Sequence, residues 1–349
     1  MRSSLTGAVL LAVLPGCAAG GGLIRNDSTW VDQAGAPVSC HDGGITRVGD
    51  TFHWYGTSYR GNPRGLWGRK AALLQNGFNC YSSKNLADWK YEGICFAFPR
   101  EGWLAQGTSH RPNVLFNDRT GKYVLWFFCI GTTEPEYPAA MLAVAVSDRP
   151  AGPFTFVGPR NSAEGHGWGQ DLGLFKDADG RGYLVYDDGH RNIRIDRLTD
   201  DFLSSSGETC VALRSDGRKK QYEGAALIRY RGRYIAAGSG VRGWNPTDTA
   251  YAVADSPLGP YVEKGLMSEQ NTWKSQISNF VFIAESDRLL AMCDQWFRGP
   301  GGTRVEIDAS LQLWLPVRFD PATGQASMQF TLEWDPWRRE EGPGAPARP

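Results

Sequence analysis

Apolar and polar positions alternate along most of this chain with a period of two, which is the pattern of β-strands rather than of helices. One unit occurs five times: an apolar strand, a short turn and a strand rich in aromatic residues. The five copies span residues 43–56, 112–127, 172–186, 225–238 and 279–292. Their turns begin 71, 59, 52 and 55 residues apart. A period of this size built from hairpins predicts a propeller or a solenoid.

A second hairpin-like segment follows each copy. These segments span residues 80–93, 143–158, 193–207, 251–265 and 311–330. Two hairpins per unit give four strands, so we predict an all-β fold, a five-bladed β-propeller with four antiparallel strands per blade. The first residues of every blade of such a propeller meet around one central funnel. Residues far apart in sequence then become neighbours.

The two ends of the chain differ from the repeats. Residues 1–17 combine a short positive start with an apolar run too short to cross a membrane, which predicts an export signal. The run ends in Leu14-Pro15-Gly16-Cys17, which resembles the lipobox of bacterial lipoproteins, with Cys17 as the lipidated residue. We expect a tether and lead-in over 18–37, the propeller over 38–337 and a disordered tail over 338–349. The expected location is the bacterial cell envelope, facing the periplasm or the cell surface, with plain secretion as the alternative.

The charge and composition of the chain limit the classes of molecule that it is expected to bind. The 37 Lys and Arg residues balance 37 Asp and Glu residues and no basic run stands out, so nucleic acid is not an expected partner. A membrane is expected only through a lipid on Cys17. Most of the 13 Trp, 13 Tyr and 16 Phe residues suit strand cores, and the remainder suit sugar binding, because ring faces pack on the C–H face of a pyranose. We expect a monomer that acts on a polysaccharide or oligosaccharide.

Six cysteines follow the lipobox: Cys40, Cys80, Cys95, Cys129, Cys210 and Cys293. Cys80 and Cys95 lie almost symmetrically about the Ala87-Asp88 turn, so they could face each other across a hairpin. The alternative is that all six are small buried side chains. The chain has no CxxC or HExxH motif, so no zinc site is predicted.

Three acidic residues stand just before the first strand of a blade. Asp42 precedes the first blade, Asp171 the third and Glu223 the fourth. A single Asp before Gly is most often a strand-end cap or a turn residue. Three carboxylates in matching places of a repeat are better explained by chemistry at the funnel.

The same segments resemble glycoside hydrolase family 43. The matching motifs are Asp42-Gly-Gly-Ile45, Asp171 to Phe175 followed by Asp177-Ala178-Asp179-Gly180, and Glu223-Gly224-Ala225, within a match over about residues 38–336. The resemblance implies a five-bladed propeller with Asp42 as the base, Asp171 as the residue that tunes and orients the acid, and Glu223 as the acid. The chemistry agrees, since glycoside cleavage needs one protonated and one ionised carboxyl group, and an activated water implies inversion.

Further motifs resemble the branch of this family that holds exo-acting β-1,3-galactanases and galactosidases. They include Trp54-Tyr55-Gly56, His110-Arg111-Pro112, Arg242-Gly243-Trp244, Ser275-Gln276 and Asp294-Gln295-Trp296. The expected activity is exo-acting removal of sugars from β-1,3-galactan or arabinogalactan-type polysaccharide. The candidate sugar-binding residues are His41, Trp54, His110, Arg111, Trp244, Gln276 and Trp296.

Two positions depart from that branch. Its members often have Gly in place of Asp42, and they have Glu in place of His110. If Asp42 is not the base, Gln276 or a neighbour is the next candidate. Other open activities are those of an α-L-arabinofuranosidase or a β-xylosidase, and the non-enzyme alternative is a glycan-binding surface lipoprotein. No cofactor is expected to be required. The broader family often has a His near a central metal ion where this chain has Gln276. Whether the funnel holds a structural calcium ion is therefore an open question at the level of the sequence.

Overall fold

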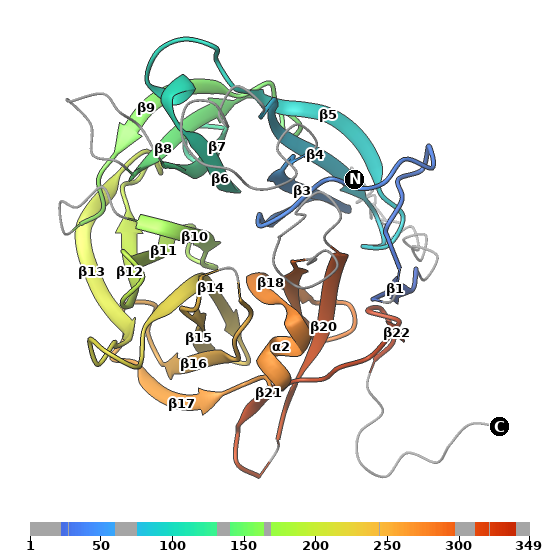
Figure 1. The fold of residues 1–349 in the computed structure, drawn as a ribbon, viewed down its shortest axis with the longest axis vertical. Helices are drawn as coiled ribbons and strands as arrows, with labels where there is room; N and C mark the ends of the chain where they lie inside the picture. The colour runs from blue at the N-terminus through green and yellow to red at the C-terminus, as the bar shows by residue number, and fades with distance from the viewer. Residues whose placement is uncertain are drawn as a thin grey trace, which may run out of the picture.

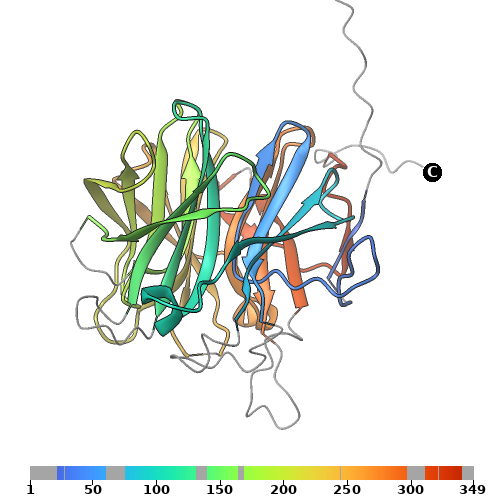
Figure 2. The ribbon, with the colours of Figure 1, turned by 90° about the horizontal axis from the view of Figure 1, so that it is seen from above.

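The computed structural model describes residues 22–26, 28–59, 75–130, 140–163, 169–243, 245–296, 311–320 and 322–339. Five four-stranded antiparallel sheets are arranged around a central axis (Figure 1). Seen from the side, the strands of the blades run between the two faces of a disc (Figure 2). The prediction of an all-β, five-bladed propeller with four antiparallel strands per blade is confirmed.

Each blade consists of two consecutive hairpins. Blade 1 contains β2 (Ile45–Val48), β3 (Thr51–Thr57), β4 (Gly77–Ser83) and β5 (Lys90–Ala97). Blade 2 contains β6 (Thr108–Asn117), β7 (Lys122–Ile130), β8 (Ala140–Ser147) and β9 (Thr155–Arg160). Blade 3 contains β10 (Gly169–Lys176), β11 (Gly182–Asp188), β12 (Ile193–Leu198) and β13 (Ser205–Leu213).

The last two blades follow the same plan. Blade 4 contains β14 (Tyr222–Tyr230), β15 (Arg233–Gly240), β16 (Thr249–Ala254) and β17 (Val262–Leu266). Blade 5 contains β18 (Gln276–Ile283), β19 (Arg288–Gln295), β20 (Leu311–Phe319) and β21 (Ala326–Met328). The short strands β1 (Ile24–Arg25) and β22 (Glu333–Trp334) pair with each other, and two single turns, η1 (Trp103–Gln106) and α2 (Gln270–Lys274), complete the described elements.

The strand order in every blade follows the sequence, so the first strand lies nearest the axis and the fourth lies outermost (Figure 1). The inner strands β6, β10, β14 and β18 contact their neighbours around the axis. Aromatic and aliphatic side chains fill the spaces between adjacent blades. Both faces of a blade are therefore buried, which explains why the apolar content of these strands is high.

Trp54 belongs to one of these cores. Its side chain is only 1% exposed, and its ring centroid lies 5.1 Å from that of Trp89 and 4.9 Å from that of Trp314. This aromatic cluster packs blade 1 against blade 5. The prediction that Trp54 binds sugar is wrong, because the side chain is enclosed by other tryptophans.

The six described cysteines are free, and all except Cys210 are buried. Cys80 lies opposite Gly93 in the β4–β5 ladder, so the register does not pair it with Cys95. The alternative of small buried side chains is the one observed. Cys17 lies outside the described residues. None of the helices within the described ranges is both long enough and apolar enough to cross a membrane.

Candidate active site

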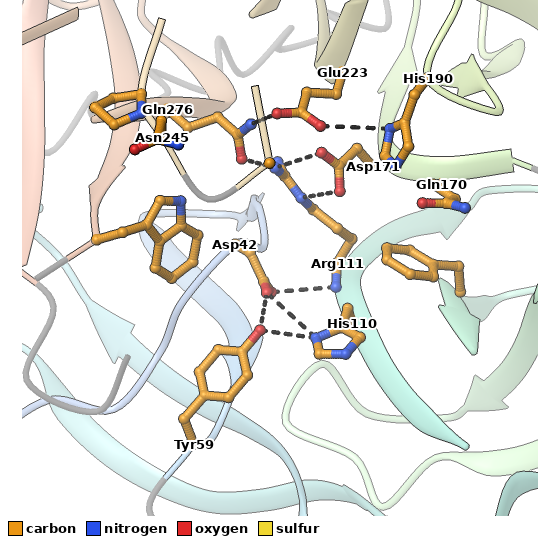
Figure 3. Close-up of a pocket in the computed structure, with 14 residues that line it drawn as sticks. Asp42, Tyr59, His110, Arg111, Gln170, Asp171, His190, Glu223, Asn245 and Gln276 are labelled. Atoms are coloured by element: carbon orange, nitrogen blue, oxygen red, sulfur yellow. Dashed lines mark hydrogen bonds and ion pairs between the residues drawn. The ribbon is translucent and has the colours of Figure 1, made fainter. Parts of the chain in front are cut away.

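The inner strand of blade 3 starts with a β-bulge. Gln170 pairs with Asp187 and Gly173 pairs with Val185, so residues 171 and 172 together face a single residue. Asp171 has a left-handed backbone there, with a φ of 32°. A bulge adds one residue to a strand and re-aims its side chain. This geometry directs the carboxylate of Asp171 into the funnel (Figure 3).

The same bulge occurs at the entrances of blades 1, 2 and 4. Its first residue has a positive φ in each case: 55° at Asp42, 57° at Arg111 and 68° at Gly224. Asp42 and Asp171 are therefore equivalent, whereas Glu223 comes one residue before the bulge. The expectation that all three carboxylates occupy matching places needs this correction. Glycine suits the bulge of blade 4, because a Cβ there would lie 3.0 Å from the carbonyl oxygen of Ile277.

The three predicted catalytic carboxylates line one cavity of about 150 Å³ (Figure 3). They come from three different blades and meet where the inner strands begin. The other described lining residues are Tyr59, His110, Arg111, Phe128, Gln170, His190, Gly243, Asn245, Pro246, Gln276 and Trp296.

Asp42 is held on one side of this cavity by three donors. The Thr57 hydroxyl donates to Oδ1 at 2.6 Å, the Tyr59 hydroxyl to Oδ2 at 2.7 Å, and the Arg111 backbone N–H to Oδ1 at 3.2 Å. Burial alone would raise the pKa of Asp42, but His110, Arg111 and Thr57 outweigh it and the pKa is lowered. Asp42 is thus an ionised carboxylate that can accept a proton.

His110 supports this side of the cavity. Its Nδ1 lies 2.8 Å from the Tyr59 hydroxyl and 3.8 Å from Oδ2 of Asp42, and its Nε2 lies 3.0 Å from the Thr108 hydroxyl. His110 was predicted to bind sugar. It lines the cavity, and it contacts both Tyr59 and Asp42.

Glu223 lies on the other side. The amide Nε2 of Gln276 donates to its Oε1 at 3.0 Å, and Nδ1 of His190 lies 3.4 Å from its Oε2. Its side chain is 9% exposed. Burial, followed by the nearby charge of Asp171, raises the pKa of Glu223 from 4.5 to about 8. Glu223 therefore keeps its proton at neutral pH, as a general acid requires.

Arg111 lies between the two sides (Figure 3). Its Nε and Nη2 contact the two carboxylate oxygens of Asp171, each at 3.2 Å, and Nη2 also donates to Oε1 of Gln276 at 2.8 Å. Asp171 Oδ2 in turn accepts the Gly224 N–H at 3.0 Å. These contacts fix the carboxylate of Asp171 close to Glu223, the residue directly before Gly224, whose N–H it accepts.

The residues around this point do not fit a calcium ion. The buried guanidinium of Arg111 already places a positive charge between Asp171 and Gln276, and it hydrogen-bonds to both of their side chains. Across the described ranges, no group of three or more His, Cys, Asp or Glu side chains is placed to hold a metal ion.

A strained turn precedes Gln276. All five residues of α2 have a positive φ between 48° and 65°, a conformation that costs an L-residue roughly 1–2 kcal/mol each. Thr272 is buried in this turn and secures it. Its N–H donates to Oδ1 of Asp248 at 3.1 Å, and its hydroxyl donates to the carbonyl oxygen of Thr247 at 2.8 Å. The strained turn thus ends at Lys274, two residues before Gln276, which is the first residue of β18.

His41 lies behind the cavity wall. It is fully buried, and its Nδ1 lies 3.5 Å from Oδ1 of Asp294, whose Oδ2 accepts the backbone N–H of Asp42 at 2.9 Å. His41 was predicted to contact sugar, but it is not among the residues that line the cavity. It instead supports Asp42 from behind, through Asp294. Trp244 lies outside the described residues, between the lining residues Gly243 and Asn245.

Residues 36–298 match the model of glycosyl hydrolases family 43. The chain belongs to this family. The family 43 assignment makes the protein a glycosidase that hydrolyses O-glycosyl bonds, so the enzyme class predicted from the carboxylates is confirmed. No curated protein sequence matches the chain.

Solved structures of family 43 share this fold. A β-1,3-galactosidase with galactodeoxynojirimycin is 26% identical, with a TM-score of 0.77 over 89% of this chain and 100% of the other. An exo-β-1,3-galactanase from Clostridium thermocellum is 26% identical, with a TM-score of 0.73 over 89% of this chain and 66% of the other. An exo-β-1,3-galactanase from Phanerochaete chrysosporium, with β-1,3-galactotriose, is 24% identical, with a TM-score of 0.75 over 90% of this chain and 68% of the other. At this identity the similarity supports the shared fold and nothing more. The predicted similarity of this family 43 enzyme to the galactanase branch is confirmed.

The lining residues of the family 43 enzyme that were not predicted from its sequence include Tyr59 and His190, which contact Asp42 and Glu223. Tyr59 follows the end of β3, and His190 lies in the turn between β11 and β12. The second strand of each blade ends at the same edge where the first strand begins. Residues that directly follow the second strand of a blade are therefore further candidates for lining the cavity.

Proposed function

We propose that this protein is an exo-acting, inverting glycosidase that removes terminal galactose from β-1,3-galactan or arabinogalactan-type polysaccharide. One observation carries the proposal: a carboxyl group that keeps its proton, Glu223, and an ionised carboxylate, Asp42, line the same cavity with Arg111 between them (Figure 3). Hydrolysis with inversion requires this pair.

The acid step falls to Glu223. Its proton passes to the glycosidic oxygen as the bond to the anomeric carbon breaks, so the leaving sugar departs as an alcohol. Asp171 favours the protonated form before the reaction, because a second negative charge close by is unfavourable. Gln276 donates to Oε1 of Glu223 and so orients the carboxyl group.

The base step falls to Asp42. It accepts a proton from a water molecule whose oxygen forms the new bond to the anomeric carbon on the face opposite the leaving group. Gln276 is less suited to this role, because its amide nitrogen is bound to Glu223 and its oxygen to Arg111, on the acid side. The hydroxyl groups of Tyr59 and Thr57 donate to the two oxygens of Asp42, which fixes the orientation of its carboxylate and favours the ionised form.

Two observations support the substrate class. The cavity formed by the described residues, about 150 Å³, is well below the roughly 300–1,000 Å³ of pockets for drug-sized ligands, which favours one terminal sugar over a polysaccharide segment. The 26% identical neighbours are described as a β-1,3-galactosidase and an exo-β-1,3-galactanase.

A panel of substrates tests the proposal. The purified enzyme should release galactose one unit at a time from β-1,3-galactotriose, and its activity on aryl β-galactoside should exceed that on aryl α-L-arabinofuranoside and β-xyloside. Preference for either pentoside would replace galactan by arabinan or xylan as the substrate. Binding of galactotriose without hydrolysis would support the glycan-binding alternative.

We also propose that the enzyme is exported and anchored through a lipid on Cys17. The proposal rests on the lipobox-like Leu14-Pro15-Gly16-Cys17 segment that ends the apolar run. An anchored exo-glycosidase would act on polysaccharide at the cell envelope.

A further inference from the structure

His190 stands beside the general acid without being part of the predicted machinery. It lies in the turn after β11, with a φ of 58°, and lines the cavity. Its Nδ1 is 3.4 Å from Oε2 of Glu223 and has no hydrogen-bond partner among the described residues. Its side chain is 41% exposed, so it connects the nearly buried Glu223 with solvent.

Asp187 fixes the position of His190. This aspartate is fully buried at the end of β11; its Oδ1 accepts the backbone N–H of His190 at 2.7 Å, and its Oδ2 lies 3.6 Å from Nδ1 of the ring. Within the described part of the chain, Oδ2 itself has no hydrogen-bond partner. A buried carboxylate in this position favours the imidazolium form, and the pKa of His190 is raised to about 9, first by Asp187.

We propose that His190, held by Asp187, is a positioning residue that places a positive charge against Glu223 and stabilises the carboxylate formed there when Glu223 gives its proton to the leaving oxygen. The inference rests on the proposed role of Glu223 as general acid. It goes beyond that role, since it assigns the group that makes proton donation easier.

The geometry suits a contact that strengthens during the reaction. While Glu223 is neutral, the 3.4 Å separation from His190 is too long for a good hydrogen bond. Once Glu223 is ionised, the pair becomes a charge-assisted contact, for which about 2.7–2.9 Å is usual. Interactions that are stronger in the transition state than in the ground state raise the rate of the chemical step.

The charged groups facing Glu223 act in opposite directions. Asp171 from β10 and Asp187 from β11 favour its protonated form, whereas Arg111 from β6 and His190 favour its ionised form; Gln276 from β18 is neutral. Removing His190 should therefore weaken the acid and raise its pKa. Removing Asp171 should do the reverse.

The test compares His190→Gln with His190→Lys over the pH range, using β-1,3-galactotriose. We expect kcat of His190→Gln to fall about tenfold to a hundredfold, with the basic limb of the kcat profile moved to higher pH. His190→Lys, which keeps a cation, should recover part of the rate. His53→Gln, on β3 and away from the cavity, is the matched control and should behave as the wild type. A lower kcat with the basic limb unmoved, or moved to lower pH, would overturn the inference.

A second measurement separates this inference from the proposed function. The ring Cε1–H signal of His190, assigned by its loss in His190→Gln, should titrate well above pH 6.5 and show an inflection near pH 8 from the ionisation of Glu223. That inflection should vanish in Glu223→Gln. This result does not depend on turnover, so an inactive wild type would refute the proposed function and leave the pairing testable. A His190 signal that does not respond to Glu223 would refute the pairing.

Discussion

Replacing Glu223 by glutamine should make the protein more stable at alkaline pH. Glutamine has the same shape and cannot ionise. In the folded wild type the pKa of Glu223 is raised to about 8, whereas the ordinary value is 4.5. Between these pH values the folded protein holds a proton that the unfolded chain has lost, so this group makes a contribution to stability that decreases as the pH rises.

The size of the effect follows from the same values. One pKa unit corresponds to about 1.4 kcal/mol, so the ionisation of Glu223 costs the folded state about 5 kcal/mol above pH 8. Solvent relieves little of this, because the side chain is 9% exposed. We expect the free energy of unfolding of Glu223→Gln to match that of the wild type near pH 4.5 and to exceed it progressively up to pH 8, by at most this amount.

Urea unfolding at a series of pH values measures this difference directly. The same variant should lose about 10²- to 10⁴-fold in kcat on galactotriose, and much less on an aryl glycoside whose leaving group departs without a proton. A stability difference that stays constant from pH 5 to pH 9 would show that Glu223 is not held protonated. Equal losses on both substrates would show that it is not the acid.

Substitutions at four other positions test separate parts of the site and of the chain. Asp171→Asn should move the basic limb of the pH–rate profile to lower pH, because the pKa of Glu223 falls when the neighbouring negative charge is removed; an unmoved limb would contradict the tuning role. Asp42→Asn should abolish hydrolysis of natural and aryl substrates alike, and added azide should partly restore turnover as an α-glycosyl azide; near-normal activity would point to Gln276 as the base. Thr272→Val should lose about 1–3 kcal/mol of stability, measured by urea unfolding, and lower kcat, while Thr272→Ser keeps both, because the hydroxyl secures the strained turn; equal behaviour of the two variants would contradict this. Cys17→Ser should move the protein from the membrane to the soluble fraction on cell fractionation with its circular dichroism unchanged, and continued membrane association would refute the lipid anchor.

The fold was predictable because its signals are local. Hairpin turns such as Gly49-Asp50 and Arg231-Gly232 recur between strands of clear period two, and they lie between the strands in the structure. The entrance bulges are not local in this sense. Whether a strand such as β14 contains one extra residue depends on its partner strand, so the one-residue offset of Glu223 from Asp42 and Asp171 could not be predicted from spacing alone.

Most of the site residues that were predicted correctly lie at or just before the start of an inner strand, as Asp42, Asp171 and Glu223 do. Trp54 was misassigned because both faces of β3 are buried, so alternation gives no sign of which aromatic side chain reaches solvent. Tyr59 and His190 both follow the second strand of a blade. Tyr59 contacts Asp42 across the first hairpin of blade 1, whereas His190 of blade 3 reaches Glu223 of blade 4 only when the two blades pack together.

The configuration of the first product tests the central claim most directly. Proton NMR of β-1,3-galactotriose hydrolysis, followed from the first minutes, distinguishes the anomers of the released galactose before they interconvert. With Glu223 as acid and Asp42 activating water, the signal of α-galactose should appear first and that of β-galactose should follow by mutarotation. Initial release of β-galactose would contradict the account, because it requires a carboxylate that attacks the sugar rather than one that deprotonates water.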